Sequence, residues 1–361
     1  MNDIADASSI YEVDTPAVLV NLDIARANII RFQRYAESHG LKVRPHIKTH
    51  KLPQIAEMQL DAGAIGITCQ KVSEAEAMTA GSPRVADVLI TYNIVGENKV
   101  RRLAALARRV RLSVVADSAE VISGLSAIFA SEPSPLAVLV ECDTGAHRCG
   151  VSSPQDAARL AELIDSAPGL AFAGLMTYPP VAGEETVERF MQEAKQCIHQ
   201  RLGERELVIS SGGTPSMMQA ANAPVVTEYR PGTYVYNDRS LVSRGVCGWE
   251  DCALTVLATV VSVPDDNRAV IDAGSKALTS DLLGLSGYGH VLGRPDIVID
   301  QLSEEHGRLV SDAPIGLSVG DKIRIVPNHA CVVTNMVDEI HIIRNGVLDG
   351  VQPVVARGCI V

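Results

Sequence analysis

The feature that most constrains the fold is an alternation of short apolar segments with amphipathic ones through the first two-thirds of the chain. Stretches such as NKVRRLAALARR and ETVERFMQEAKQCIHQRL have the spacing of amphipathic helices and separate eight strand-like segments. These predicted strands cover residues 42–47, 66–70, 87–92, 111–116, 136–142, 171–178, 207–211 and 226–230. Strands that alternate with helices pair in parallel, because each helix carries the chain back across the sheet. The expected class is therefore α/β.

Eight such strands in roughly 190 residues is the number that closes a (β/α)8 or TIM barrel. An open doubly wound sheet is the alternative, but no GxGxxG pattern follows the first strand, as a dinucleotide-binding sheet would require. We therefore expect the barrel. Because such barrels place their chemistry at the carboxyl ends of the strands, the residues directly after each predicted strand are the candidates for function.

The pattern changes near residue 246. From there, runs such as LTVLATVVSVP, RAVIDAG, KIRIVP and EIHIIRNG are separated by turn signals, and few helical patterns intervene. This predicts a second, mostly antiparallel β domain. A strand-like run at 15–23, TPAVLVNLD, can pair with that domain. The predicted domains are thus a barrel over 23–245 and a β domain over 246–361, which residues 1–22 join.

Charge and composition narrow the class of protein. The chain has 32 Lys and Arg against 43 Asp and Glu, a net charge of −11, which disfavours nucleic acids and anionic membranes as partners. No apolar run approaches the roughly 18 residues of a membrane helix, and the first ten residues contain no Lys or Arg of a signal peptide. The eight cysteines form no CxxC pair. We expect a cytoplasmic enzyme without a disulfide framework.

The first chemical candidate is Lys48 in RPHIKTHK, at the end of the first predicted strand. A lysine at such a place can form a Schiff base if burial and neighbouring cations lower its pKa. The basic residues close to it in sequence are Arg44, His46, His50 and Lys51. A solvated basic loop is the alternative, and spacing alone does not decide between the two.

Two glycine-containing loops follow the seventh and eighth predicted strands. The first contains Ser211, Gly212, Gly213 and Thr214, and the second contains Gly232 and Thr233. Glycines allow a close approach of the backbone to a ligand, and a helix that begins at Thr214 would direct free N–H groups at an anion. TIM barrels often bind a phosphate with this pair of loops. Each loop alone is an ordinary turn, but both together with a Schiff-base lysine suggest pyridoxal phosphate.

His329 and Cys331 lie two residues apart in VPNHACVVTN, within the predicted β domain. On a strand, residues i and i+2 share a face, so both side chains could reach one ion. A thiolate beside an imidazole favours zinc or another borderline-soft metal. A hydrogen-bonded histidine next to a core cysteine is the alternative. The metal site is favoured over this alternative only if the strand faces the mouth of the barrel.

The chain resembles the group of D-threonine aldolases and D-serine dehydratases, whose catalytic barrel is of the alanine racemase type. The matching segments run in order over nearly the whole chain. They are RPHIKTHK, GITCQKVSEAEA, DTGAHRCGV, GLMTY, SSGGTPS, PGTYVYND, IDAGSK, SEEHG and PNHAC. Because PHxK together with a carboxy-terminal HxC is specific to the group, the chain is identified as a member. The resemblance implies a (β/α)8 barrel, a β domain and a homodimer with active sites near the interface.

The resemblance also implies roles for particular residues. Lys48 matches the lysine that holds pyridoxal phosphate, and the two glycine loops match its phosphate-binding segments. His329 and Cys331 match a metal pair, which implies a divalent ion such as Zn, Mn or Mg. The residues that resemble cofactor-binding ones are Gln70, Arg148, Tyr178, Ser211, Gly212, Gly213, Thr214, Arg230, Gly232 and Thr233.

Four of these roles have structural alternatives. They are a capping contact for Gln70, a surface ion pair for Arg148 and core packing for Tyr178. Arg230 resembles the alanine racemase arginine that contacts the pyridine nitrogen, and its alternative is a side chain turned to solvent or paired with Glu228.

The implied substrate is a D-configured β-hydroxy-α-amino acid, and the implied reaction is that of a lyase. An aldolase breaks the Cα–Cβ bond and yields glycine and an aldehyde, whereas a D-serine or 3-hydroxy-D-aspartate dehydratase yields ammonia and a 2-oxo acid. Cys331 resembles the dehydratases, and the stretch after Tyr178 lacks a histidine that some aldolases have. CQKVSEAEA and DTGAHRCGV resemble the aldolases. We expect the aldolase on overall resemblance.

Two other functions remain open. Lys48 and Arg230 would permit an amino-acid racemase. A non-catalytic barrel that only binds pyridoxal phosphate is a rival from another class, but such proteins are a single barrel. The residues after 246 and the HxC pair therefore argue against it.

Overall fold

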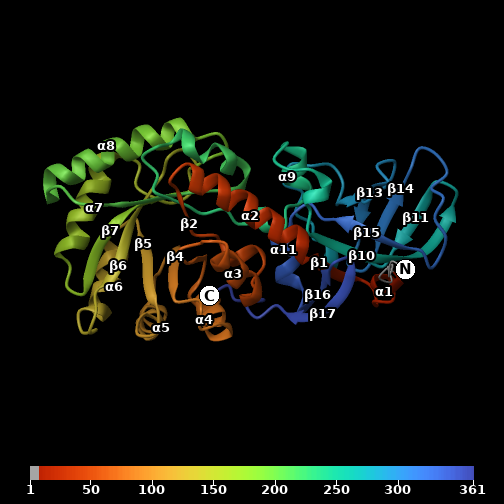
Figure 1. The fold of residues 1–361 in the computed structure, drawn as a ribbon, viewed down its shortest axis with the longest axis horizontal. Helices are drawn as coiled ribbons and strands as arrows, with labels where there is room; N and C mark the ends of the chain where they lie inside the picture. Colours follow the sequence, from red (N-terminus) through yellow and green to blue (C-terminus); the bar gives the residue numbers. More distant parts are fainter. Residues whose placement is uncertain (1–7) are drawn as a thin grey trace. The chain divides into compact units, whose positions relative to one another are not determined.

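The computed structural model describes residues 8–361, which group into two compact units (Figure 1). The barrel unit consists of Ile30–Lys48, Pro53–Gly232 and Cys359–Val361. The β unit consists of the described residues up to Ile29, Thr49–Leu52 and Thr233–Gly358. Two of the crossings between the units thus come directly after Lys48 and Gly232. The domain boundaries near residues 23 and 246 stay a prediction.

Eight parallel strands form the sheet of the barrel unit, in the order β2-β9-β8-β7-β6-β5-β4-β3. A parallel bridge between His46 and Thr68 joins the segment after β2 to β3 and closes the ring. This confirms the (β/α)8 barrel, and each predicted strand overlaps one observed strand. The strands are β2 (Lys42–Val43), β3 (Ile67–Cys69), β4 (Asp87–Asn93), β5 (Arg111–Ala116), β6 (Leu136–Cys142), β7 (Leu170–Thr177), β8 (Val208–Ser211) and β9 (Glu228–Tyr229).

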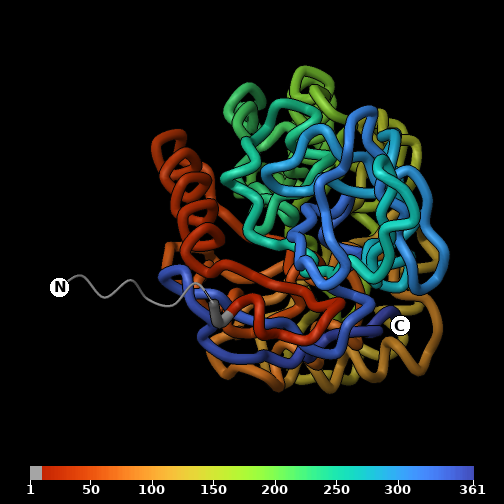
Figure 2. Tube along the Cα trace, turned by 90° about the vertical axis from the view of Figure 1, so that its right-hand side faces the viewer, coloured from red at the N-terminus to blue at the C-terminus, as the bar shows by residue number. Residues whose placement is uncertain are grey.

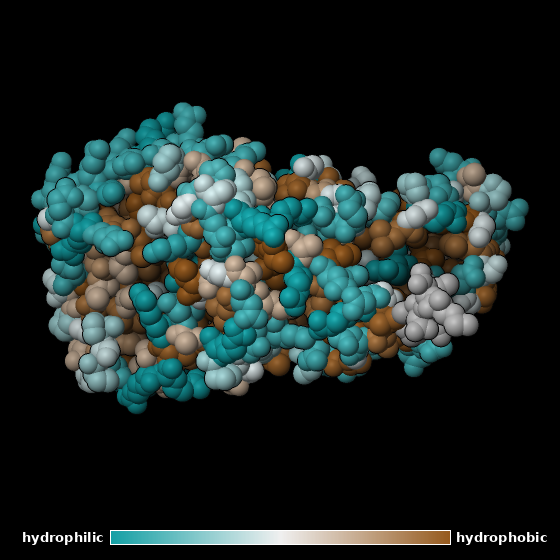
Figure 3. All heavy atoms as spheres, viewed as in Figure 1, coloured by the Kyte–Doolittle hydropathy of each residue, from teal (hydrophilic) through white to brown (hydrophobic). Residues whose placement is uncertain are grey.

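Helices connect the strands on the outside of the barrel (Figure 1). They are α2 (Leu22–Ser38), α3 (Pro53–Asp61), α4 (Val72–Gly81), α5 (Glu97–Ala107), α6 (Ala119–Phe129), α7 (Pro154–Ser166) and α8 (Glu184–Leu202). Helix α7 begins where the sequence provides a cap: Ser153 accepts the N–H of Asp156, and Pro154 occupies the first turn. Helix α8 buries Val187, Met191 and Ile198 on one face, while hydrophilic side chains cover its outer surface (Figure 3).

The helices after β2 and β8 are 3₁₀ helices, and these two segments carry predicted cofactor residues. Lys48 lies in η1 (Ile47–Thr49), and Thr214 begins η2 (Thr214–Asn222). No described helix has the length and apolar character needed to cross a membrane.

The β unit contains a nine-stranded sheet in which every pairing is antiparallel except that of β1 with β16, which confirms a mostly antiparallel β region. Strand β1 pairs with β10 on its other side, so an amino-terminal segment lies beside carboxy-terminal strands (Figure 2). The strands are β1 (Ala17–Asn21), β10 (Leu254–Asp265), β11 (Arg268–Ile271), β12 (His290–Val291), β13 (Val298–Leu302), β14 (Gly307–Val310), β15 (Lys322–Val326), β16 (Glu339–Arg344) and β17 (Val347–Pro353).

Short helices connect the strands of the β unit. They are α1 (Ser8–Tyr11), η3 (Thr233–Val235), α9 (Arg239–Ser243), η4 (Trp249–Asp251), α10 (Ser275–Leu278) and α11 (Ala330–Met336). Residues 233–245 group with this unit, since the N–H of Ala253 donates to the carbonyl of Tyr236 and the N–H of Arg239 to that of Pro327.

Candidate active site

Lys48 is half-buried directly after the first strand of the barrel. Its backbone N–H donates to Nδ1 of His46 at 3.3 Å, and Nε2 of the same ring lies 3.0 Å from Oε1 of Gln70. Gln70 follows β3, and its side-chain amide donates to the carbonyl of Thr91 at 2.9 Å. Its backbone N–H donates to the carboxylate of Glu74 in α4. Gln70 thereby holds the imidazole that contacts the Lys48 backbone.

Two of the basic neighbours expected around Lys48 bind elsewhere. Arg44 donates to the carboxylates of Glu228 at 2.9 Å and Asp87 at 2.5 Å. Nζ of Lys51 donates to Oδ1 of Asn335 at 2.8 Å and to the carbonyl of Ala356 at 3.1 Å, all within the β unit. Neighbouring oxygens thus bind both of these charges.

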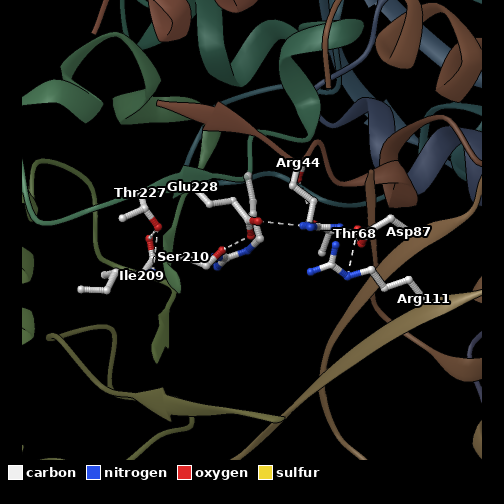
Figure 4. A network of polar contacts seen from close by, with 9 residues as sticks. Arg44, Thr68, Asp87, Arg111, Ile209, Ser210, Thr227 and Glu228 are labelled. Carbon is white, nitrogen blue, oxygen red and sulfur yellow. Dashed lines mark hydrogen bonds and ion pairs between the residues drawn. The ribbon is translucent and has the colours of Figure 1, made fainter. Parts of the chain in front are cut away.

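Arg230, directly after β9, is a buried residue of the barrel unit, only 6% exposed. Its guanidinium donates to Oγ of Ser210 at 2.5 Å and to the carbonyl of Thr177 at 2.7 Å. Ser210 in turn donates to Glu228, which also accepts from Arg44 (Figure 4). Loss of hydration on burial lowers the pKa of Arg230 to about 10, against the opposing effect of the Glu228 carboxylate. A side chain turned to solvent is thus excluded, and the link to Glu228 runs through Ser210.

The two glycine loops after β8 and β9 are hydrogen-bonded to each other. The N–H of Gly232 donates to Oγ1 of Thr214 at 3.2 Å, and the N–H of Arg230 donates to the carbonyl of Ser211 at 2.9 Å. A Cβ atom on Gly212 would lie 2.6 Å from the backbone nitrogen of Arg230, so only glycine fits. The structure therefore brings Ser211, Gly212, Gly213, Thr214 and Gly232 together at the carboxyl ends of two adjacent strands.

Tyr178 and Arg148 form a pair at the same end of the barrel strands. The guanidinium carbon of Arg148 lies 4.6 Å from the centroid of the Tyr178 ring, a cation–π contact. Tyr178 is 43% exposed, which excludes core packing as its role. Its ring lines a cavity of about 280 Å³ together with one of the predicted phosphate-loop residues. The lining includes Gly145, Ala146, Tyr178, Gly213, Ser216 and Tyr229.

A cluster of acidic residues near Arg148 was missed from the sequence. Ligand atoms of Asp117, Glu141 and Cys149 all lie within 4.8 Å of one another at the ends of β5 and β6. Burial, reinforced by the charge of Asp117, raises the pKa of Glu141 to about 7, although Arg148 opposes the shift. Glu141 can therefore hold or release a proton near neutral pH. The available signal was one glutamate within the apolar strand LAVLVEC.

The expectation that a strand presents His329 and Cys331 on one face is wrong. Strand β15 ends at Val326, His329 directly precedes α11, and Cys331 lies in the first turn of that helix. The reason is a cap from a distant part of the chain, since the carboxylate of Asp238 accepts the N–H of Ala330 at 3.1 Å. The pair still meets, because the thiol and the imidazole are hydrogen-bonded.

Further polar groups surround this pair within the β unit. Sγ of Cys331 lies 3.1 Å from Oγ1 of Thr49 and 3.5 Å from Oγ1 of Thr233. Burial works against its ionisation, but the hydrogen bond and charge of His329 lower the pKa of Cys331. The pKa of His329 is raised to about 9, since contacts with Cys331 and Asp281 outweigh the cost of burial. A thiolate next to an imidazole is a donor set that suits a divalent ion.

The predicted site residues thus divide between the two units. Within the barrel unit, the glycine loops lie together with Arg230, and Tyr178 pairs with Arg148. Within the β unit, Thr233 joins His329 and Cys331. Among the described residues, none forms a hydrogen bond or ion pair with the ammonium group of Lys48.

Comparison with known families assigns both parts of the chain. Residues 20–240 match the model described as alanine racemase, N-terminal domain, and residues 253–343 match a putative serine dehydratase domain. The chain is 34% identical to D-threonine aldolase of an Arthrobacter species, over 96% of this chain and 93% of the relative. It is 32% identical to D-threo-3-hydroxyaspartate dehydratase of a Delftia species, over 90% of this chain and 92% of the relative.

Solved structures give the same result. The D-threonine aldolase of Filomicrobium marinum superposes with a TM-score of 0.90 at 33% identity and covers 98% of both chains. A variant of D-threo-3-hydroxyaspartate dehydratase has a TM-score of 0.85 at 29% identity, over 96% of this chain and 98% of that one. In that variant a cysteine is replaced by alanine and the protein is in the metal-free form. A second variant replaces a histidine two positions before that cysteine.

Proposed function

Because the chain belongs to the alanine racemase N-terminal domain family, among relatives that are D-threonine aldolases and D-hydroxyaspartate dehydratases, we propose that it is a pyridoxal-phosphate- and metal-dependent lyase. Its substrates are D-β-hydroxy-α-amino acids. The observation that carries the proposal is that two groups of residues match the sequence pattern of this family, and that the structure brings the members of each group together. A lysine and two joined glycine loops lie in the barrel unit, and a histidine–cysteine pair lies in the β unit.

The barrel unit fits pyridoxal phosphate. Lys48 offers an amine without a partner among the described residues, and the two glycine loops lie together at the carboxyl ends of β8 and β9, where the start of η2 can bind a phosphate. Space at Gly212 is too small for a side chain. When bound, the cofactor supplies an electron sink for charge that develops at the substrate α-carbon.

Arg230 is proposed to interact with the ring nitrogen of the cofactor. Its buried cation would face the ring nitrogen of the cofactor without giving up a proton, so that nitrogen stays unprotonated. Ser210 and the Thr177 carbonyl hold the guanidinium in place. Gln70, Arg148 and Tyr178 line the rest of the cofactor site, and the cavity beside Tyr178 leaves room for substrate.

The β unit fits a divalent metal such as Zn, Mn or Mg. Cys331 ionises more readily beside the His329 imidazole, and the two side chains offer sulfur and nitrogen. The dehydratase variant that lost the corresponding cysteine and is metal-free supports this pair. A bound metal would polarise the β-hydroxyl of the substrate. Thr49 and Thr233, which contact Cys331, follow Lys48 and Gly232 directly in the chain.

For the bond that breaks, we propose the aldolase reaction, supported by the D-threonine aldolases at 34% identity and at a TM-score of 0.90. In this reaction a base takes the proton of the β-hydroxyl and the Cα–Cβ bond opens. The second candidate is the dehydratase, which the cysteine of the metal pair favours. There Lys48 would remove the α-proton, and a metal held by His329 and Cys331 would supply Lewis acidity to the leaving hydroxyl group.

Product analysis tests the reaction. Purified protein with pyridoxal phosphate and a divalent metal is given D-threonine, D-serine and 3-hydroxy-D-aspartate separately, with Lys48→Ala as the inactive control. We expect glycine and an aldehyde without ammonia. Ammonia with a 2-oxo acid would establish the dehydratase instead, and no product from any substrate would contradict the lyase.

We further propose that the protein acts as a homodimer in the cytoplasm. The family resemblance supports the dimer, and the acidic charge balance supports a small-molecule substrate without nucleic-acid or membrane partners. Light scattering should give twice the 38.4 kDa mass of one chain. A mass of 38.4 kDa at micromolar concentration would contradict the dimer.

A further inference from the structure

The His329 imidazole has a second partner besides Cys331. Its Nδ1 lies 2.6 Å from Oδ2 of Asp281, a residue 48 positions earlier in the chain. An ionised carboxylate has no proton to donate, so Nδ1 carries the proton and donates it. The ring nitrogen left to bind a metal is then Nε2. A carboxylate that fixes the tautomer and the orientation of a metal-binding histidine also raises the basicity of the ring.

The turn that carries Asp281 is held in an unusual backbone conformation. Thr279, which ends α10, is buried and has φ 68° and ψ 164°, a region that β-branched residues rarely adopt. Its Oγ1 accepts the N–H of Asp281 at 3.2 Å, and Leu283 also has a positive φ of 48°. Such conformations persist only where surrounding contacts enforce them, and they cluster at functional sites. The turn thus aims one carboxylate at one imidazole.

The rest of the ligand pair is fixed in a comparable way. The Asp238 carboxylate holds the start of α11 through the Ala330 N–H, and the hydroxyl groups of Thr49 and Thr233 contact the Cys331 sulfur. Asp238 accepts the backbone N–H between the two ligands, whereas Asp281 is the carboxylate hydrogen-bonded to the imidazole itself.

We propose that Asp281 is a positioning residue of the metal centre, which orients His329 so that Nε2 faces the ion. This inference rests on the proposed function, since it assigns a role towards the metal of that function. Metal affinity tests this role of Asp281, and it can be measured independently of enzyme activity.

Metal affinity of the purified protein is the direct test, measured with Zn²⁺ by competition against a chelating dye. Asp281→Ala should weaken Zn²⁺ binding by about 10- to 100-fold, the range found when such supporting carboxylates are removed. Asp281→Asn keeps the shape and an acceptor oxygen but loses the charge, so it should fall between Asp281→Ala and the wild type. Asp281→Glu should restore part of the affinity. Asp300→Asn, on β13 and paired with Arg308, is the matched control and should bind as the wild type does.

A spectroscopic measurement separates this role from a merely structural one. With Co²⁺ as the probe, the visible absorption of the bound ion should change in Asp281→Asn, because the imidazole ligand is less well oriented. The absorbance of bound pyridoxal phosphate and the far-ultraviolet circular dichroism should stay as in the wild type. If Asp281→Ala fails to fold, the isosteric Asp281→Asn still decides the question.

His329→Ala distinguishes failure of the inference from failure of the proposed function. If His329→Ala loses Zn²⁺ while Asp281→Ala and Asp281→Asn bind it with wild-type affinity and an unchanged Co²⁺ spectrum, the role of Asp281 is overturned and the metal site stands. If His329→Ala itself keeps wild-type affinity, the metal site of the proposed function is wrong, and the inference falls with it.

Discussion

At the scale of single residues, the barrel differs from most (β/α)8 barrels, whose interiors are filled by branched aliphatic side chains. Here Arg44, Glu228 and Arg230 are buried and linked through Ser210, with each cation bound to an oxygen acceptor. Removing one partner of a buried charge network leaves the others unpaired, which is strongly destabilising. We therefore expect substitution of any one of these residues to destabilise the barrel unit.

Glu141 gives a prediction that depends on pH. Its pKa is raised to about 7 by burial, from an ordinary value near 4.5, so the folded protein binds a proton that the unfolded chain has released. This contribution to the free energy of unfolding is complete below about pH 4.5 and is lost as the pH rises through about 7. We expect Glu141→Gln to remove on the order of 2–3 kcal/mol of this pH dependence.

Urea unfolding from pH 4.5 to pH 8.5 measures this effect. Glu97→Gln, on the exposed face of α5, is the control and should keep the wild-type slope. A Glu141→Gln protein whose stability follows the wild type through the whole range would show that Glu141 titrates at its ordinary pKa.

At the scale of elements, the loop after β8 predicts a contrast between two glycines of the barrel unit. Gly212→Ala places a Cβ atom 2.6 Å from a backbone nitrogen, which must cost about 1–3 kcal/mol and should weaken pyridoxal phosphate binding. Gly124→Ala, in α6, meets nothing within 4 Å and should stabilise by about 0.5–1 kcal/mol. Thermal unfolding and cofactor titration check both. Equal effects of the two substitutions on stability and on cofactor affinity would contradict the close packing at Gly212.

The helices and strands also show which parts of the fold sequence patterns can predict. The eight barrel strands were predictable because alternation of strands and helices is a local signal with one global solution. Helix α11 was predicted as a strand, since its cap comes from Asp238, about 90 positions away. Glu141 was missed because six apolar or small neighbours make its strand look like ordinary core. Contacts between distant positions decide both cases, and a single sequence does not record them.

The same limit applies to the predicted site residues. The motif resemblance identified Lys48, Arg230 and His329 as candidates, but it did not identify the residues that hydrogen-bond to them. Ser210 and Asp281 carry no motif of their own, because one hydroxyl and one carboxylate gain their role only from the atoms beside them.

At the scale of the whole molecule, the division of residues between two units predicts separable losses. His329 and Cys331 lie in the β unit, whereas Lys48 and the glycines of both loops lie in the barrel unit. We therefore expect His329→Ala to lose bound metal and activity while pyridoxal phosphate stays bound with its visible absorbance intact. Elemental analysis and absorbance on one sample give both readings. An unchanged metal content would refute the histidine–cysteine pair.

Lys48 is the proposed attachment point of pyridoxal phosphate in the barrel. The most direct test of this role is reduction of the cofactor-loaded protein with borohydride, followed by peptide mass mapping, with Lys51→Ala as the control because Lys51 binds Asn335 and Ala356. We predict that the reduced cofactor is found on Lys48 in the RPHIKTHK segment, in the wild type and in Lys51→Ala alike. Label on another lysine, or no label in protein that shows the cofactor absorbance, would contradict the account.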